Sequence, residues 1–373
     1  MSINTDRLVE EFIELVKVDS ESQHEEKIAQ VLKDKFITLG LDVFEDDSQK
    51  ETNFGAGNLI CTLKGTKQDV KPIYFTCHMD TVSPGNGIKP IIQDNGYITS
   101  DGTTILGADD KAGIAAMFEF IRQIKEQHIE HGDIQFIITV GEESGLIGAQ
   151  AVNPEHLKAA YGYALDSDGD VGNIVVAAPT QAKVTAHIHG QSAHAGVAPE
   201  KGVSAITVAA KSIAKMPLGR IDEETTANIG SFSGGGATNI VCDYVEIIGE
   251  ARSLVKEKLD NQLEQMKQAF ESTAEKLGAK ADVVIEHMYP NFVYSEADEV
   301  VQIAVQAAKN LGHTSELMTS GGGSDANIFN GFDVPTVNLS VGYEEIHTTN
   351  ERISIESLEK LTAYLVEIIK EVK

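Results

Sequence analysis

The sequence predicts an α/β protein with a smaller α+β domain inserted into it. Two continuous apolar runs, 134–140 and 161–165, are typical of central parallel strands that are covered on both faces. From residue 179 to residue 290 the pattern instead reads strand-helix-strand-strand-helix-strand, which is the ferredoxin-like order. The α/β pattern then resumes. We therefore expect one domain made of residues 1–178 and 291–373, with residues 179–290 as the insertion.

The elements before the insertion follow from hydrophobic spacing. Leu8, Phe12 and Val16 recur at helical spacing, so the chain is expected to open with an amphipathic helix. A second helix over 25–38 is expected to end near Gly40, a favourable residue beyond a helix C-terminus. Further elements are predicted as strands at 41–44, 58–63 and 73–77, a buried helix at 111–128, and strands at 134–140 and 161–165.

The insertion opens with residues 182–189, which alternate as a half-buried strand does. Its other elements are predicted as a helix at 203–215, strands at 227–233 and 240–251, a helix at 256–277 and a strand at 281–287. The chain after it is predicted to form a helix at 299–311, a strand after Gly312, a helix after Ser324, a strand at 334–341 and a helix at 355–372.

Composition excludes several classes of function. The 373 residues are 42% hydrophobic and 23% charged, as in an ordinary globular protein. A net charge of -27 argues against nucleic acid and anionic membrane surfaces, which require basic patches. Three widely spaced cysteines form no disulfide framework and no zinc motif, which fits a reducing compartment. We expect a cytoplasmic protein with no signal peptide and no membrane span.

Side chains of the metal-binding type stand just past several predicted strands. His78 follows the strand at 73–77, Glu143 follows 134–140, and Asp166 follows 161–165. Functional groups gather beyond the carboxyl ends of strands in open α/β sheets. Imidazole and carboxylate are ligands that zinc accepts, and cobalt and manganese suit them as well. The sequence therefore predicts a hydrolytic metal site at this edge of the sheet.

Each motif has a simpler explanation when it is taken alone. A histidine near a strand end is more often a satisfied core residue than a ligand, and paired glutamates usually lie on a solvated surface. Here Glu142 and Glu143 follow an apolar run and are flanked by Gly141 and Gly145, which is unusual for a surface pair. The combination of all these positions is what favours a metal centre.

These motifs carry a family resemblance over nearly the whole chain. The landmarks are His78-Met79-Asp80-Thr81-Val82, Gly107-Ala108-Asp109-Asp110-Lys111-Ala112-Gly113, Gly141-Glu142-Glu143-Ser144-Gly145, Asp166 and His347-Thr348. In this order and spacing they resemble the dinuclear-zinc exopeptidase family of peptidase T, glutamate carboxypeptidases and aminoacylases. Leu165-Asp166-Ser167-Asp168-Gly169 and His347-Thr348-Thr349-Asn350-Glu351 are most similar to the peptidase T branch. The resemblance implies a mixed-sheet catalytic domain with an inserted ferredoxin-like lid that forms a homodimer.

The resemblance also implies a role for each residue of the metal centre. Asp109 would bridge two divalent metals, expected to be zinc, and its peptide bond to Asp110 would be cis. The remaining ligands would be His78 and Asp166 for one metal, and Glu143 and His347 for the other. Glu142 would be the general base. Asp80 would accept the second ring N–H of His78 and fix its tautomer.

The inserted domain carries a second set of candidates. In Gly190-Gln191-Ser192-Ala193-His194-Ala195-Gly196 the histidine resembles one that reaches the substrate carbonyl in the family, often from the partner subunit. His194 is thus a candidate oxyanion donor, although a turn histidine after a strand is the simpler explanation. Asn239 matches a family position, and Arg252 is expected to bind a substrate carboxylate unless it forms a surface ion pair.

Three functions remain open at this stage. We expect an exopeptidase that hydrolyses short peptides, an aminotripeptidase like peptidase T. An N-acyl-amino-acid deacylase or a carboxypeptidase of the same family uses the same amide hydrolysis and anchors a different end of the substrate. A non-catalytic binding protein on the same fold is the third, and the complete ligand set together with Glu142 counts against it.

Overall fold

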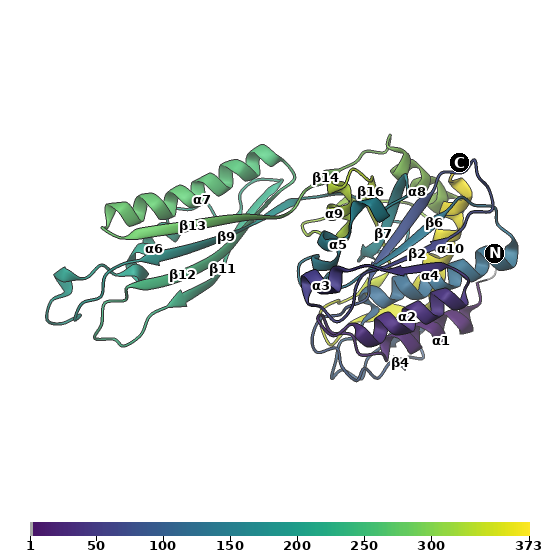
Figure 1. Cartoon of the computed structure of the whole chain (residues 1–373), viewed down its shortest axis with the longest axis horizontal. Helices are drawn as coiled ribbons and strands as arrows, with labels where there is room; N and C mark the ends of the chain where they lie inside the picture. The colour runs from purple at the N-terminus through teal and green to yellow at the C-terminus, as the bar shows by residue number, and fades with distance from the viewer. Residues whose placement is uncertain (1–2) are drawn as a thin grey trace. The chain divides into compact units, whose positions relative to one another are not determined.

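The computed structural model describes residues 3–373, which form two compact units. The larger unit runs to Ala177 and resumes over Tyr294–Thr319 and Ser324–Lys373. The smaller unit comprises Ala178–Val293 and the short segment Ser320–Gly323. In Figure 1 the colour follows the residue number, so the chain can be traced through both units. The sequence places the boundaries at 178/179 and 290/291, within a few residues of the structural ones, and does not foresee that 320–323 belongs with the smaller unit.

The larger unit is built on a mixed β-sheet, which confirms the predicted fold class. Its strand order is β1-β2-β6-β3-β7-β16-β8, with β15 beside β8. Four neighbours at the centre run parallel: β6 (Ile134–Thr139), β3 (Ile73–His78), β7 (Tyr161–Ser167) and β16 (Thr336–Ser340). The outer strands are β1 (Asp42–Glu45), β2 (Leu59–Leu63), β8 (Ile174–Ala178) and β15 (Leu317–Thr319). Antiparallel pairs β1/β2, β2/β6 and β8/β16 make the sheet mixed.

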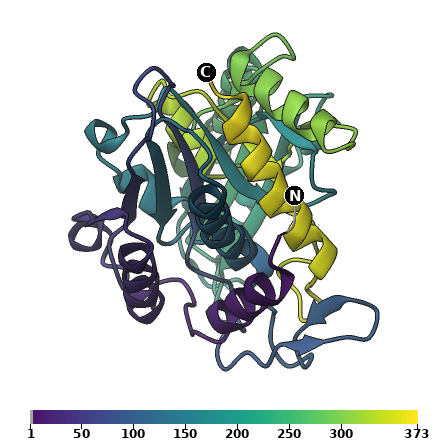
Figure 2. The same ribbon diagram turned by 90° about the vertical axis from the view of Figure 1, so that its right-hand side faces the viewer.

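Helices cover this sheet. They are α1 (Thr5–Val16), α2 (Glu26–Thr38), α3 (Ser48–Thr52), α4 (Ala108–Gln127), α5 (Ile147–Ala151), α8 (Glu299–Asn310), α9 (Asp325–Gly331) and α10 (Ile355–Glu371). Figure 2 shows α10, in yellow, lying along the strands of this unit. The core is aromatic at its centre, where the Phe75 ring meets Phe120 edge-on at 5.4 Å and stacks with Phe136 at 6.1 Å. Within residues 3–373, no helix is both long and apolar enough to cross a lipid bilayer.

A close approach between α4 and the sheet brings the beginning of this helix to the strand ends. A Cβ atom on Gly113 would lie 2.6 Å from Cys77 Sγ and 2.6 Å from Asp110 Oδ1. A side chain at this position would therefore force the helix away from the end of β3. Glycine here lets the start of α4, with Asp109, lie beside His78.

Short elements escape the sequence patterns. A second sheet has the order β17-β18-β5-β4, and its strands are β17 (Tyr343–Glu344), β18 (Arg352–Ser354), β5 (Tyr97–Thr99) and β4 (Ile91–Ile92). None of them is long enough to show a period of two, which is why they read as loops. The five-residue β8 was also missed, because its apolar run merges with the alternating strand that follows it.

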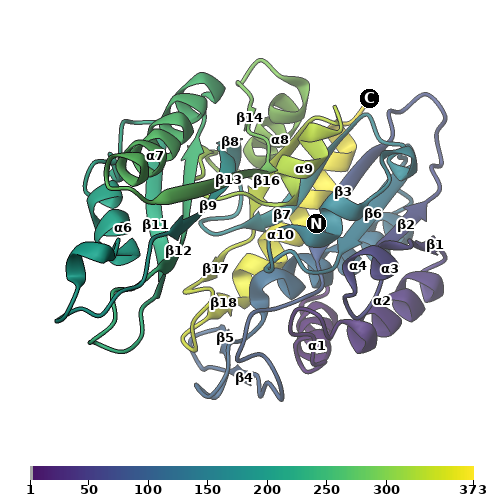
Figure 3. The same cartoon turned by 60° about the vertical axis from the view of Figure 1, so that its left-hand side comes forward.

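The smaller unit is a five-stranded antiparallel sheet with the order β10-β11-β12-β9-β13. Its elements are β9 (Thr180–His189), α6 (Ala205–Ile213), β10 (Gly219–Arg220), β11 (Thr225–Gly234), β12 (Tyr244–Ser253), α7 (Lys256–Lys276) and β13 (Lys280–Tyr289). Both helices pack on this sheet and on each other (Figure 3). Among its four long strands, β13-β9-β12-β11 is the ferredoxin-like order. The chain returns through β14 (Phe292–Val293).

One boundary in the smaller unit differs from the prediction. The strand expected at 240–251 begins only at Tyr244, and residues 235–243 form the connection from β11. In this loop Ile240 makes an isolated bridge with His194 instead of joining the sheet. The apolar Ile240-Val241 pair resembles a strand start, but Ile240 is exposed and Gly235 has a φ of +111° that a strand does not use.

Candidate metal centre

The ends of three neighbouring strands carry the candidate ligands. His78 is the last residue of β3, Asp166 lies near the end of β7, and Glu142 and Glu143 follow β6. The strands are parallel and in register, with His78 opposite Thr139 of β6, so their carboxyl ends reach the same edge. Asp109 arrives from the start of α4.

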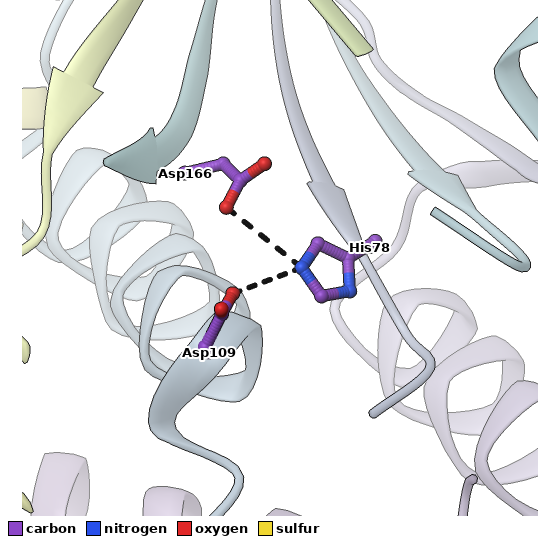
Figure 4. Close-up of side chains that lie close together, drawn as sticks. All are labelled: His78, Asp109 and Asp166. Carbon is purple, nitrogen blue, oxygen red and sulfur yellow. Dashed lines mark hydrogen bonds and ion pairs between the residues drawn. The ribbon is translucent and has the colours of Figure 1, made fainter. Parts of the chain in front are cut away.

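The first group consists of His78, Asp109 and Asp166, shown in Figure 4. His78 Nε2 lies 3.0 Å from Asp109 Oδ1 and 3.8 Å from Asp166 Oδ1. One ligand-type atom from each residue lies within 4.8 Å of the other two. The side chains point toward one another from β3, β7 and the beginning of α4, which is the arrangement that a cation would require.

The second group consists of Asp109, Glu143 and His347. His347 Nε2 lies 2.8 Å from Glu143 Oε1 and 3.2 Å from Asp109 Oδ2. Asp109 therefore offers one oxygen to each imidazole and belongs to both groups. His347 is half-exposed and has a φ of +62°, on a loop that follows β17. The expected cis peptide bond between Asp109 and Asp110 is present.

The protonation preferences of these side chains fit a cation site. Burial raises the pKa of Asp166 well above its usual value, and the nearby Asp109 carboxylate adds to the effect. Burial alone would lower the pKa of His78, but its hydrogen bonds to Asp109 and Asp80 raise it well above the ordinary range. Hydrogen bonds to Asp109 and Glu143 raise the pKa of His347 to about 10. Divalent cations would favour the ionised form of these carboxylates by their own charge.

Asp80 contacts His78 differently from the expectation. His78 Nδ1 lies 3.0 Å from the backbone carbonyl oxygen of Asp80 and 3.5 Å from its carboxylate. The backbone oxygen is the closer partner and the carboxylate lies slightly farther away, so the role of Asp80 in fixing the tautomer stays a prediction. The carboxylate accepts the backbone N–H groups of Glu142 at 3.0 Å and Glu143 at 3.3 Å, and the Ser22 hydroxyl at 2.6 Å. Asp80 thus holds the turn that carries both glutamates.

Glu142 lies beside the two groups and belongs to neither of them. Burial raises the pKa of its carboxyl well above the usual value, and the charge of Asp166 raises it further. Its position after β6 is set by Gly141, whose φ is +57° and where a Cβ atom would lie 2.3 Å from the Phe54 ring. Only glycine fits this turn.

Sequence reasoning missed several residues that hold the ligands. Tyr343 donates its hydroxyl to Asp166 Oδ1 at 3.1 Å, and the Asn338 side chain bonds the backbone of Asp166 on both sides. Thr139 donates to the buried carboxylate of Asp325 at 2.5 Å. Glu351 accepts three backbone N–H groups from the turn that carries Asp109. Glu351 ends the motif stretch that begins at His347, but sequence reasoning assigned this role neither to it nor to the other positions, because the role depends on contacts between segments distant in sequence.

The candidates in the smaller unit belong to neither of the two groups described above. His194 is exposed, and its Nδ1 accepts the N–H groups of Gly196 at 3.2 Å and Val197 at 3.1 Å. That pattern leaves Nε2 as the ring donor. Asn239 is exposed on the loop before β12. Arg252 forms a two-pronged pair with Glu250 at 2.9 and 3.1 Å and donates to the Gly321 carbonyl at 3.2 Å.

Comparison with known proteins identifies the family. Residues 74–371 match the model of peptidase family M20/M25/M40, a range that includes every candidate ligand. The chain belongs to this peptidase family. It is therefore a peptide hydrolase, and the resemblance seen in the motifs is confirmed.

Individual relatives extend over the full chain. An aminopeptidase PepT from Bacillus cereus ATCC 10987 is 65% identical, with a TM-score of 0.94 and coverage of 99% of both chains. A tripeptidase from Staphylococcus aureus is 55% identical, with a TM-score of 0.96 and coverage of 99% of this chain and 98% of the other. The protein YqjE of Bacillus subtilis, described as uncharacterized, is 64% identical over 99% of each chain. The mixed α/β fold of this M20 protein is thus shared with solved peptidase structures.

Metal stoichiometry tests the shared position of Asp109. We expect Asp109→Ala to abolish tight binding of two divalent ions, because both groups lose the same carboxylate. Glu143→Ala removes a ligand from one group only and should leave one tight site. Calorimetric titration of each variant with zinc measures the number of ions bound. One tight site remaining in Asp109→Ala, at the affinity of the unaltered protein, would contradict a shared ligand.

Proposed function

We propose that this M20 peptidase is an aminopeptidase that removes the N-terminal residue from short peptides, tripeptides foremost. The observation that carries the proposal is the pair of ligand groups sharing Asp109, in a chain 65% identical to an aminopeptidase PepT and 55% identical to a tripeptidase. Identity at that level over the whole length makes a common substrate class the simplest expectation. The proposed location is the cytoplasm, in keeping with three free cysteines.

The donor set fits two divalent cations. His78 and Asp166 would complete one site, Glu143 and His347 the other, and Asp109 would belong to both. Carboxylate and imidazole suit zinc first, with cobalt and manganese as alternatives. When bound, such ions polarise a scissile carbonyl and lower the pKa of water toward 7.

Glu142 is proposed as the group that moves the proton. Its carboxyl lies next to the ligands, and burial beside Asp166 gives it a stronger hold on a proton than an exposed glutamate has. A group of this kind can accept the proton of the attacking water and deliver it to the leaving amine. Asp80 fixes the backbone of Glu142 and Glu143 together, so base and ligand keep a constant separation.

The smaller unit is proposed to recognise the substrate. His194 would donate its Nε2 proton to the substrate carbonyl. Asn239 lies in the neighbouring segment, because its backbone carbonyl accepts the N–H of Ala195 and the next residue, Ile240, forms a β-bridge with His194. Arg252 is proposed to bind the carboxylate of a short peptide. Glu250 already accepts hydrogen bonds from two nitrogens of the Arg252 guanidinium group. A substrate carboxylate would therefore have to displace Glu250 or bind the remaining N–H donors of Arg252.

We further propose that the chain forms a homodimer through the smaller unit. β13 is the last strand of the five-stranded sheet and pairs with β9, so within residues 3–373 its outer side forms a sheet edge. Val284, on this strand, is 48% exposed. Pairing of two such edges would satisfy the backbone groups of both copies and protect an edge that otherwise invites aggregation.

Glu142→Gln tests the proton-transfer role. The amide keeps the size of the side chain and cannot accept the proton, so kcat should fall by about 100-fold or more while metal binding persists. Steady-state tripeptide hydrolysis and zinc titration measure the two effects. Glu155→Gln, an exposed glutamate in the same unit, is the matched control and should keep full activity. Turnover retained in Glu142→Gln would refute the assignment.

A substrate panel separates the candidate activities of the family. The metal-loaded protein is given free, N-acetylated and C-amidated di- and tripeptides together with N-acyl amino acids. An aminopeptidase needs the free amine, so N-acetylation should block cleavage and C-amidation should reduce it less. Chromatography should show the N-terminal residue released first. Preferential cleavage of N-acyl amino acids would establish the deacylase instead, and release of the C-terminal residue would establish a carboxypeptidase.

Sedimentation tests the dimer. The unaltered chain at physiological salt should sediment with twice its 40.2 kDa mass. Val284→Glu places like charges at the proposed pairing edge and should shift the protein toward the monomer. A monomer at all micromolar concentrations of the unaltered chain would exclude the proposed pairing.

A further inference from the structure

The turn that carries Asp109 is held by a carboxylate from the other end of the chain. Glu351 is 1% exposed and accepts three backbone N–H groups of this turn. Leu106 and Gly107 donate to Oε2 at 2.7 Å each, and Asp109 donates to Oε1 at 2.9 Å. Both oxygens of the carboxylate are therefore committed to one short stretch of backbone.

This stretch lacks the support that a regular helix gives. Gly107 has a φ of +74°, and Asp109 and Asp110 depart from helical geometry with ψ angles of 102° and 28°. The backbone N–H groups at the start of a helix have no partner within the helix itself. The direction in which the Asp109 side chain projects consequently depends on an outside acceptor, and Glu351 is that acceptor.

Glu351 also belongs to the loop that carries His347. Three residues lie between the two in the chain, and the N–H of Glu351 bonds the carbonyl of Thr348 at 3.2 Å. A single carboxylate thus connects the backbone of the shared ligand to the loop of the exposed one. Burial raises the pKa of Glu351, and the backbone N–H groups of Asp109, Gly107 and Leu106 that it accepts oppose that shift.

We propose that Glu351 is a positioning residue that fixes the separation of Asp109 and His347 and thereby sets the affinity of both metal sites. The inference rests on the proposed metal centre. Glu351 bonds Asp109 through the backbone N–H of that residue, so its effect passes through the backbone of Asp109. Because Asp109 belongs to both ligand groups, a displaced turn should weaken both ions rather than one.

Glu351→Gln is the direct test. The glutamine amide has the same shape as the carboxylate, but an NH2 group replaces one of the two oxygens. In either orientation this NH2 group would face a backbone N–H group, which is also a donor. Titration of the metal-free full chain with cobalt, followed by the visible absorption of the bound ion, measures both binding steps without any substrate. Both dissociation constants should rise by roughly 10–100-fold, with an altered cobalt spectrum.

Controls separate positioning from general destabilisation. Glu345→Gln makes the same change on the same loop at an exposed carboxylate, and it should leave both constants unchanged. Thermal unfolding of each metal-free variant is measured in parallel. Should Glu351→Gln fail to fold, Glu351→Asp decides the question, since it keeps the charge and shortens the reach by one methylene. It should weaken both binding steps to a smaller degree.

Two outcomes overturn the inference. The inference fails if Glu351→Gln binds both cobalt ions within twofold of the unaltered protein, even when its unfolding temperature is lower. Where Glu351→Gln does not fold, the same criterion applies to Glu351→Asp. The loss of one binding step alone would show that Glu351 acts on a single site. A failure of the unaltered chain to bind two cobalt ions would instead refute the proposed metal centre, and this inference with it.

Discussion

The carboxylate of Asp109 lies between two imidazoles that come from opposite ends of the chain. One oxygen is 3.0 Å from His78 and the other is 3.2 Å from His347. The rest of the larger unit serves this arrangement. Gly113 lets α4 lie against β3, which brings Asp109 to the strand ends. The C-terminal segment returns to the same place and supplies both His347 and the carboxylate of Glu351.

Electrostatics explains why such a cluster is unstable as a set of bare ions. Burial raises the pKa of Asp166 and Glu142, and a neighbouring carboxylate, Asp109 for the first and Asp166 for the second, raises it further. Divalent cations would favour the ionised ligands by their own charge, while Glu142, which is outside both groups, remains free to exchange a proton. Crowded, buried carboxylates do not stabilise the fold, but the same arrangement suits the site to hydrolytic chemistry.

Much of this was predictable because each motif is local. An apolar run followed at once by His78, Glu143 or Asp166 marks a strand and its functional end together, and parallel strands bring those ends to one edge. The supporting residues were not predictable in the same way. Tyr343 and Glu351 lie in or beside strands of two or three residues, too short to show a period, and they act on residues more than 170 positions away. The sequence placed Asp80 beside His78, but it did not reveal that the Asp80 carboxylate accepts the backbone N–H groups of Glu142 and Glu143.

The sequence by itself determined the fold class, the inserted ferredoxin-like order, the family and the ligand types, because these depend on periodicity and on motifs that are contiguous in the chain. Only the tertiary structure decided which atoms meet: that Asp109 offers one oxygen to each histidine, that His78 Nδ1 lies 3.0 Å from the backbone oxygen of Asp80, and that Glu351 accepts the N–H groups of the Asp109 turn. These contacts join segments far apart in sequence. The distances between these atoms are set by how helices and strands pack, and they cannot be read from a local stretch of sequence.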